Sequence, residues 1–214
     1  MTPATEQPRT RMSATDRRQL ILKAARLAFA EGGYHEVSLA SVAERAGVSK
    51  ALLYEHFGSK RALYQAMLEM HTQDLVGRIA AAVAAAEPGE PRLLAGLNAF
   101  FDFVQDPRGG WRVIFRNAGD PDVAASLAEL RDGVAAAVAA LMSEEAEAHF
   151  PDAPERAQML QMVAQQLVGA MQSLADWWEL HPEVPRKRIL QVAMDFVWTG
   201  QERLSRGERW TGPA

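Results

Sequence analysis

Residues 37–60, VSLASVAERAGVSKALLYEHFGSK, constrain this chain more than any other segment. Ser38 and Ser49 each precede a short apolar-periodic run, where a serine hydroxyl can accept from the free amides of the first helical turn. Gly47 lies between the runs and can adopt the left-handed conformation that ends a helix. Two capped helices with a glycine in the turn between them predict a helix-turn-helix.

The second of these helices has two different faces. Leu53 and Phe57, four residues apart, are expected to face the core, which leaves Leu52 and Tyr54 on or beside the exposed face. A helix lying in a major groove uses such groups, because apolar side chains meet thymine methyls and hydroxyls reach phosphates. A purely structural helical hairpin with solvated polar groups fits the periodicity equally well.

The residue pattern from Gln19 to Leu63 favours the first alternative. It resembles the DNA-binding domain of the TetR (tetracycline-repressor) family of bacterial transcriptional regulators. The resemblance covers about a third of the chain and is carried by Ile21, Ala24, Ala25, Phe29, Gly33, Tyr34, Val37, Ser38, Val42, Ala43, Ala46, Gly47, Val48, Ser49, Leu53, Tyr54, His56, Phe57, Ser59, Lys60 and Leu63.

Helical periodicity and breakers predict an all-α chain with no sheet. The expected helices run over about 15–31, with Gly32 and Gly33 ending the first, then the pair above, 60–86, 91–105, 111–117, 121–149, 154–180 and 185–205. The expected organisation is a flexible arm at 1–14, a three-helix helix-turn-helix DNA-binding domain at 15–60, and a C-terminal helical ligand-binding and dimerisation domain at 61–214.

Charge is divided unevenly along the chain. The net charge is −4, yet residues 1–62 hold ten Lys/Arg against six Asp/Glu, and residues 63–214 hold thirteen against twenty-one. The excess of basic residues in residues 1–62 predicts that this N-terminal part binds nucleic acid. No apolar run reaches the roughly 18 residues of a membrane span, and residues 1–19 are polar with no secretory core. We therefore expect a cytoplasmic, nucleoid-associated bacterial protein that does not contact a membrane.

Enzymatic chemistry is not expected. The chain has no G-x-G-x-x-G, no P-loop and no G-x-S-x-G elbow. It has no cysteine, and its five histidines are scattered without a metal-binding spacing. We expect no catalytic residues, no metal site and no cofactor.

The resemblance and side-chain chemistry together assign the DNA contacts. Ser38 and Lys60, at helix N-termini, suit phosphates, and Tyr54 and His56 match phosphate-contacting positions of the family. The base edges are assigned to the start of the recognition helix, at Ser49, Lys50, Ala51 and Leu52, with Lys50 best able to donate to guanine.

In TetR-family proteins the last two helices pair with those of a second copy. The expected homodimer interface here comprises Leu167, Leu174, Ile189, Val192 and Phe196. An ordinary monomer core is the alternative for this apolar stripe.

Aromatic and methionine side chains in the C-terminal domain, residues 61–214, predict a cavity for a small apolar effector. The candidate lining residues are Met67, Phe100, Phe103, Trp111, Phe115, Arg116, Met171 and Trp178. Each could equally be core. Arg112 and Arg116 would suit an anionic group, whereas Asp176 beside Trp177 would suit a cation, and the sequence leaves this choice open.

These observations predict a TetR-type repressor that binds a palindromic operator in double-stranded DNA as a dimer and is released by a largely apolar small molecule. A TetR-type activator or a ligand-independent regulator is the alternative within the family. A helical small-molecule-binding protein without gene regulation is the alternative from another class.

Overall fold

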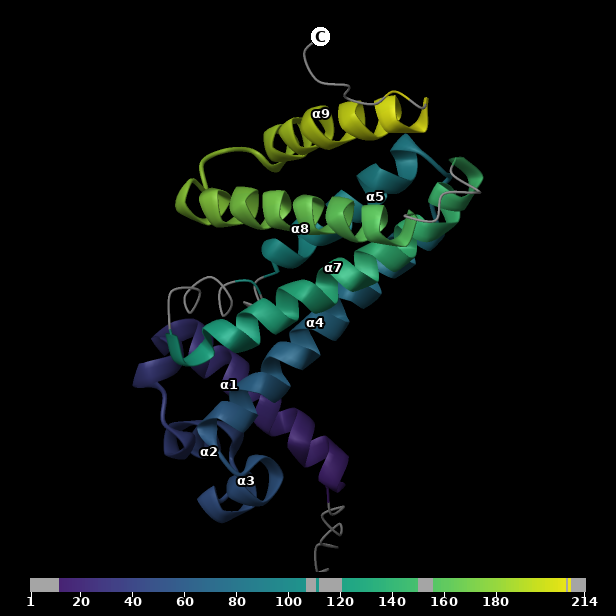
Figure 1. Ribbon diagram of the computed structural model, residues 1–214. Coiled ribbons are helices and arrows are strands. Elements are labelled where there is room, and N and C mark those ends of the chain that lie inside the picture. The colour runs from purple at the N-terminus through teal and green to yellow at the C-terminus, as the bar shows by residue number, and fades with distance from the viewer. Residues whose placement is uncertain (1–11, 107–110, 112–120, 150–155, 207, 209–214) are drawn as a thin grey trace, which may run out of the picture. The chain divides into compact units, whose positions relative to one another are not determined.

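The computed structural model describes residues 12–106, 111, 121–149, 156–206 and 208. These residues form α-helices and contain no strand, so the predicted all-α fold is confirmed (Figure 1). The chain divides into two compact units, Met1–Met67 and Leu68–Ala214. We expected the boundary at residues 60 and 61, but the first turns of helix α4 (Lys60–Ala84) belong to the first unit.

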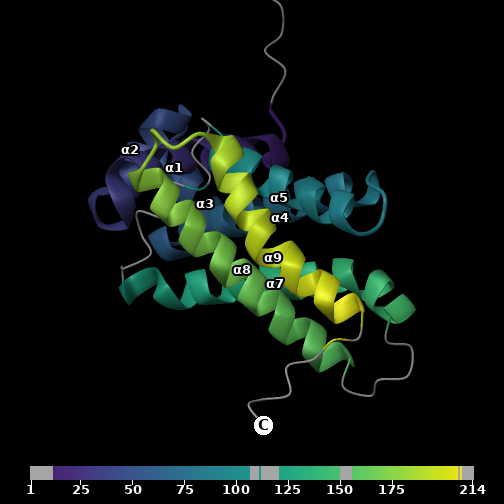
Figure 2. The same cartoon turned by 90° about the horizontal axis from the view of Figure 1, so that it is seen from above.

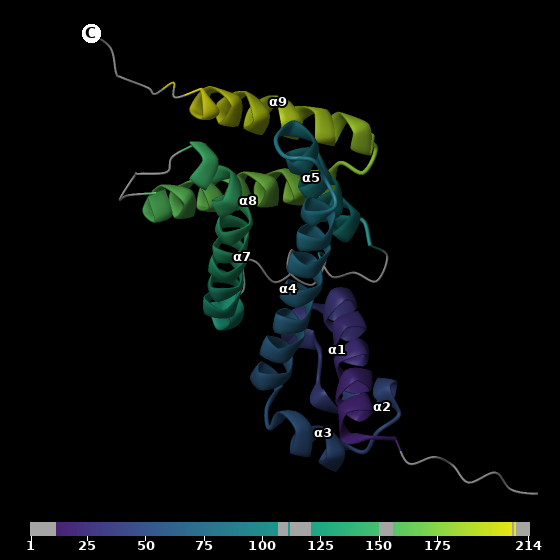
Figure 3. The ribbon, with the colours of Figure 1, turned by 90° about the vertical axis from the view of Figure 1, so that its right-hand side faces the viewer.

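The first unit consists of α1 (Ala14–Glu36), α2 (Leu39–Ala46), α3 (Lys50–Phe57) and the start of α4. Figure 3 shows α1 and the two short helices α2 and α3 gathered around the start of α4. Tyr64 of α4 is fully buried, and its ring centroid lies 5.1 Å from that of Phe29 and 5.1 Å from that of Tyr34. This packing explains why the unit extends past residue 60.

Side-chain caps fix where these helices begin. Ser38 accepts from the Ser41 amide, and the Ser41 hydroxyl accepts in return from the Ser38 amide, which completes a capping box. Ser49 accepts from the Leu52 amide at 3.2 Å. Ser13 caps α1, which begins at Ala14, one residue before the predicted start. The predicted end of the first helix corresponds to a kink at Gly33 (φ 75°, ψ 177°), beyond which α1 continues to Glu36.

The turn between α2 and α3 ends α2 in the Schellman manner. Gly47 adopts φ 66° and ψ 30°, its amide donates to the Glu44 carbonyl at 3.0 Å, and the Val48 amide donates to the Ala43 carbonyl at 3.0 Å. These bonds satisfy carbonyls that the helix end leaves open. The left-handed conformation at Gly47 therefore sets the direction in which α3 leaves α2.

The second unit contains the remainder of α4 with α5 (Glu90–Val104), α7 (Pro121–His149), α8 (Arg156–Leu180) and α9 (Arg186–Ser205). Helix α7 packs on α8 and α5 packs on α9. Helices α8 and α9 form a hairpin through residues 181–185 (Figures 1 and 2). The helix predicted at 111–117 lies outside the described residues, except for Trp111.

Polar contacts join the ends of these helices. The Trp178 indole donates to the Val184 carbonyl at 2.8 Å and closes the turn after α8. Arg186, at the start of α9, donates to the side chain of Asn98 at 3.0 Å and pairs with Asp102 at 2.9 Å. These bonds fix α9 against α5, so the hairpin has a defined position within the unit.

Replacement of Gly47 by alanine should destabilise the helix-turn-helix without any steric clash. No atom lies within 4 Å of a Cβ built on Gly47, so the cost comes from the left-handed backbone alone. That conformation costs an L-residue about 1–2 kcal/mol. Urea denaturation followed by circular dichroism should report a loss of this size.

Gly77→Ala is the matched control, because Gly77 lies inside α4 and has equally open space around its Cβ position. Alanine there should raise the free energy of unfolding by roughly 0.5–1 kcal/mol, since it favours the helix. Equal stability of the two variants would contradict this account of the turn.

Candidate functional site

A surface depression on the first unit gathers several of the residues predicted to bind DNA. Ser38, Lys50, Tyr54 and Lys60 all line it, although they come from the caps and bodies of three helices. The remaining lining residues are His35, Glu36, Val37, Leu39, Ala40, Gly58 and Ser59. The turns at Gly47 and Gly58 bring these segments, distant in sequence, to one face of the unit.

Lys60 is held in place by the end of α1. Its ammonium group donates to the His35 carbonyl at 3.0 Å and lies 4.7 Å from the ring centroid of Tyr34. Tyr54 is 44% exposed, and the Lys50 ammonium lies 5.9 Å from its ring centroid. Two ammonium groups and a phenol hydroxyl are thus presented together, which is the donor set that phosphate oxygens accept from.

The other predicted DNA contacts lie on α3 outside this depression. Ser49 and Ala51 are exposed, and Leu52 and His56 are partly exposed. On the opposite side of α3, Leu53 and Phe57 are buried, and the Arg18 guanidinium lies 4.7 Å above the Phe57 ring. Helix α3 therefore presents small and apolar groups outward from a fixed base, as readout of base edges in a major groove requires.

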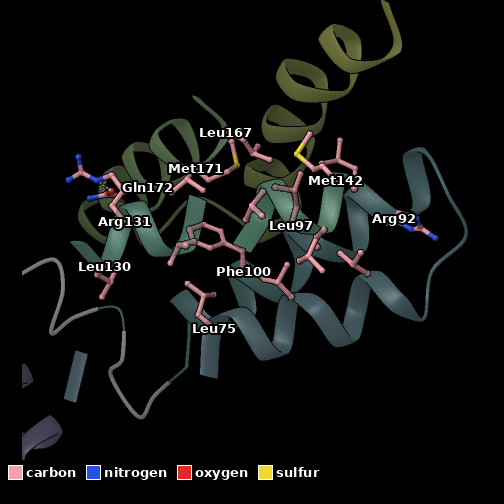
Figure 4. Close-up of a pocket in the computed structure, with 18 of the residues that line it drawn as sticks. Leu75, Arg92, Leu97, Phe100, Leu130, Arg131, Met142, Leu167, Met171 and Gln172 are labelled. Atoms are coloured by element: carbon pink, nitrogen blue, oxygen red, sulfur yellow. Dashed lines mark hydrogen bonds between the residues drawn. The ribbon is translucent and has the colours of Figure 1, made fainter. Parts of the chain in front are cut away.

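The second unit contains a partly open cavity of about 290 Å³. Its walls are mainly aliphatic, with polar side chains toward its ends (Figure 4). Helices α4, α5, α7 and α8 supply most of the lining, which comprises Leu75, Ile79, Val83, Gly89, Arg92, Leu93, Gly96, Leu97, Phe100, Trp111, Ala124, Leu127, Leu130, Arg131, Val134, Val138, Leu141, Met142, Leu167, Val168, Met171, Gln172 and Gln201.

Three of the predicted effector residues line this cavity, namely Phe100, Trp111 and Met171. Phe103 and Trp178 are buried in the core of the second unit and do not line it. Met67 is buried in the first unit. Phe115 and Arg116, like Arg112, lie outside the described residues.

Most of the lining is aliphatic. The sequence-based prediction of the effector site relied on aromatic residues and missed these aliphatic side chains. Leu75, Ile79 and Val83 recur every four residues along α4. Helix α7 carries the same kind of stripe at Leu127, Leu130, Val134, Val138 and Leu141, within its alanine-rich sequence. The sequence signal that could have predicted this lining is the helical spacing of branched aliphatic residues among alanines. Alanine leaves space that a larger side chain would fill.

Polar groups lie toward opposite ends of the cavity. Figure 4 shows Arg131 and Gln172 at one end, where the Arg131 Nε donates to the Gln172 Oε1 at 3.1 Å, and Arg92 at the other. Near the Arg131 end, burial raises the pKa of Asp176, Arg131 opposes this increase, and the charge of Glu179 adds to it. Hydrogen bonding from the Trp111 indole N–H lowers the pKa of this carboxyl.

Asp176 and its sequence neighbour Trp177 have different surroundings. Trp177 is 44% exposed and stacks on His181, with ring centroids 4.0 Å apart and planes 12° apart. Asp176 instead interacts with Trp111, which comes from a distant part of the chain. Trp111 lines the cavity, whereas Asp176 is not among the lining residues.

The residues predicted to form a dimer interface are placed differently from one another. Ile189 is 3% exposed, Leu174 is half-buried, and Leu167 lines the cavity. Val192 and Phe196 are 43% and 72% exposed on α9. Three further large apolar side chains are exposed on α8, namely Met162, Trp177 and Leu180. Exposed apolar side chains gathered on two adjacent helices are typical of a protein–protein interface.

The described residues contain neither a metal-binding cluster nor a membrane-spanning helix. No group of three or more His, Cys, Asp or Glu side chains among them could hold a metal ion. None of the helices in the described part of the chain is long and apolar enough to cross a membrane.

Both units match known protein families. Residues 21–67 match the family described as bacterial regulatory proteins, tetR family, and residues 88–200 match the tetracyclin repressor-like C-terminal domain. The HTH-type transcriptional activator FasR of Mycolicibacterium smegmatis is 34% identical over 194 residues, which cover 89% of this chain and 85% of FasR.

Solved structures share the fold. A TetR-like transcriptional regulator from Rhodococcus sp. RHA1 has 27% identity and a TM-score of 0.65, covering 90% of this chain and 99% of that one. The regulator FadR from Bacillus subtilis, in complex with stearoyl-CoA, has 14% identity and a TM-score of 0.69, covering 89% and 99%. The family matches and the identity to FasR establish that this chain belongs to the TetR family of bacterial transcriptional regulators, which are DNA-binding proteins and not enzymes.

Proposed function

We propose that this TetR-family regulator is a homodimeric repressor that binds a palindromic operator at the nucleoid and releases it when an aliphatic small molecule enters the second unit. The observation that carries the proposal is the partly open cavity with its aliphatic walls. Contact between these apolar walls and water is unfavourable. A bound apolar ligand would remove that apolar surface from water.

DNA binding in this proposal uses the depression on the first unit and the outward face of α3. Lys60, Tyr54 and Ser38 position the unit on phosphates, with His56 as a further phosphate contact. Lys50, Ser49, Ala51 and Leu52 face the base edges. The whole motif spans only about 20 residues, so one copy offers too little contact for tight, specific binding.

A second copy supplies the missing contact area. We place the dimer interface on the exposed apolar surface of α8 and α9, which includes Phe196, Val192 and Leu180. Two-fold symmetry would then present two α3 helices to successive major grooves about 34–36 Å apart, and this explains a palindromic operator.

The ligand proposed for the cavity is elongated and largely aliphatic. Leucine, valine, isoleucine and methionine side chains dominate the walls, whereas Arg92, Arg131 and Gln172 are among the few polar side chains. The stearoyl-CoA bound to B. subtilis FadR carries such an alkyl chain, which supports a fatty-acyl or related chain as the ligand class. A ligand changes DNA affinity only if it binds the two conformations of the protein unequally.

Helix α4 is the proposed route of coupling. It begins at Lys60 and continues without a break to Leu75, Ile79 and Val83, which line the cavity. Expansion of the cavity by a ligand would move these side chains, and a continuous helix transmits such a shift along its axis. Coupling of this kind is typically worth about 1–3 kcal/mol.

Activation of transcription is the second candidate function, because the relative at 34% identity, FasR, is described as an activator. The two outcomes share the same DNA contacts. They differ in where the operator lies relative to a promoter, so a transcription assay with the chain's own operator distinguishes them.

The first prediction separates phosphate from base contacts. Lys60→Ala should weaken binding to every duplex and reduce the slope of log affinity against log salt by about one. Lys50→Ala should instead relax the preference at one operator position by roughly 1–3 kcal/mol. Fluorescence anisotropy on an operator selected from random duplexes, at several salt concentrations, measures both. Lys187→Ala, an exposed lysine of the second unit, is the control, and variants indistinguishable from it would refute the assignment.

The second prediction concerns assembly. Phe196 is 72% exposed in the single chain, so Phe196→Asp should leave the fold intact. In a dimer interface it would bury an unpaired charge, which costs several kcal/mol, and should give monomers with little operator affinity. Light scattering at micromolar concentration measures the mass. Leu94→Asp, at an apolar position of α5 that is 38% exposed, is the control and should remain dimeric. A monomeric parent protein would rule out the proposed dimer.

The third prediction tests the cavity as the effector site. Val138→Trp should fill it, since Val138 lines the cavity, whereas Ala136→Trp places the same ring on the exposed face of α7. We expect octanoate, 1-octanol or stearoyl-CoA to weaken operator binding of the parent by about 5- to 150-fold. The Val138 variant should bind operator but lose this response, and the Ala136 variant should keep it. A response retained by both would place the effector elsewhere.

A further inference from the structure

One end of the cavity presents hydrogen-bond donors. Arg131 of α7 and Gln172 of α8 both line the cavity and lie together at this end (Figure 4). The Arg131 Nε donates to the Gln172 Oε1 at 3.1 Å. A guanidinium can only donate, so this bond identifies the amide oxygen of Gln172. The Gln172 NH2 group and the two terminal NH2 groups of Arg131 are then left for other acceptors.

Beyond this bond, neither side chain donates to another residue in the described part of the chain. Arg131 is exposed and Gln172 is partly exposed, so water can accept from both when no ligand is bound. The walls next to them are mainly aliphatic. A hydrated cationic end beside an apolar interior suits a ligand that has one polar group and one alkyl chain.

The aliphatic wall continues from this end along α7. Val134, Val138 and Met142 follow Arg131 in the lining. Residues 131 to 142 of an α-helix extend about 16 Å along its axis, which is longer than an extended octyl chain. A ligand with its polar group at Arg131 therefore has apolar wall for a chain of this length.

A carboxylate matches the donors better than other polar groups do. It has two acceptor oxygens and no donor, and the planar fork of a guanidinium can bind both oxygens. An ammonium group would be repelled by Arg131, whereas a hydroxyl or an ester offers no charge to it. Because this end is partly exposed, the carboxylate would keep part of its hydration, and it avoids the full cost of burying a charge.

The nearby negative groups do not use the terminal donors of Arg131. Asp176 is not among the lining residues, and its carboxyl accepts a hydrogen bond from the Trp111 indole. Arg131 acts on Asp176 through charge, as does Glu179 with the opposite sign. The hydrogen-bonding capacity of the Arg131 terminus thus remains for a ligand.

The described lining contains one other arginine, Arg92, at the opposite end (Figure 4). Its Nε is inaccessible to solvent, and Arg92 already takes part in an interaction within the chain. Arg131 is therefore the more available cation, and it has a second donor beside it in Gln172.

We propose that Arg131 and Gln172 bind the carboxylate of an unesterified alkyl carboxylic acid, whose chain lies along the aliphatic walls. This inference rests on the proposed function, since it concerns the same cavity. It narrows the ligand class from fatty-acyl chains in general to the free acid, and it assigns the polar group to the Arg131 end of the cavity.

Calorimetric titration of the full chain without DNA at neutral pH tests this with octanoate, octanamide, methyl octanoate and octylammonium. Octanamide keeps the shape of octanoate but has no charge, and a donor replaces one of its two acceptor oxygens. Octanoate should bind about tenfold more tightly than octanamide or the methyl ester, as expected for the loss of one charge-assisted hydrogen bond. Octylammonium should bind most weakly.

Two variants test the two donors. Arg131→Gln removes the charge, and should weaken octanoate binding about tenfold while changing octanamide binding by less than about threefold. Gln172→Glu keeps an acceptor for the Arg131 Nε but puts a negative charge in place of the donor, and should also weaken octanoate binding about tenfold. Arg92→Gln, the same substitution at the opposite end, is the control and should bind octanoate like the parent.

Each contrary result overturns the proposal in a recognisable way. Equal affinity for octanoate and octanamide would show that the site does not recognise a carboxylate. Octanoate binding that is weakened by Arg92→Gln and not by Arg131→Gln would place the polar group at the other end. Tightest binding of methyl octanoate would indicate an esterified ligand, and tightest binding of octylammonium would indicate a cation site.

Failure of the proposed function gives a different result. Binding of none of the four probes would show that the cavity takes no alkyl ligand, and would refute the proposed effector together with this inference. Operator affinity is measured separately and without probe. A parent protein that binds no operator would refute the proposed function, whereas the order of the four probe affinities would still decide the carboxylate site.

Discussion

The aromatic cluster of Phe29, Tyr34 and Tyr64 is the contact on which the DNA-binding unit depends. Tyr64 meets both partners edge-on at 5.1 Å, and all three rings are buried. Such pairs contribute about 0.5–1.5 kcal/mol each beyond the area they bury. The cluster fixes the first turns of α4 against the end of α1. Because Lys60 begins α4 and reaches the His35 carbonyl, the same cluster positions a cation on the depression that also contains Ser38 and Tyr54.

The helix-turn-helix could be predicted almost completely from sequence, because its determinants are local. Ser38, Ser49 and Gly47 act through hydrogen bonds and backbone angles within a few residues, and these follow from residue type. The cavity could not be predicted in the same way. Its lining combines Leu75, Val134 and Leu167 from three helices, and no local rule states which apolar stripe meets a neighbour and which borders a void. Aromatic residues such as Phe103 and Trp178 entered the core instead.

Helix α8 shows why the sequence did not distinguish residues of the dimer interface from residues of the effector cavity. Leu167 and Met171 line the cavity on one side, whereas Trp177 and Leu180 are exposed on another. A helix that is apolar nearly all round must be covered on more than one face. Both predictions drew on the same apolar residues, and periodicity alone does not say which face meets a ligand and which meets a second copy.

This double use of α8 has a mechanical consequence for the proposed regulator. A ligand that displaces Met171 or Leu167 acts on the helix that also carries part of the proposed dimer surface. Well-packed interfaces do not deform continuously, so a small shift of one face favours one of a few discrete arrangements of the two copies. The spacing of the two recognition helices would then change with the occupancy of the cavity. Ligand binding and DNA binding are in that case linked through the dimer as well as through α4, and by thermodynamic reciprocity operator DNA must change ligand affinity by the same factor.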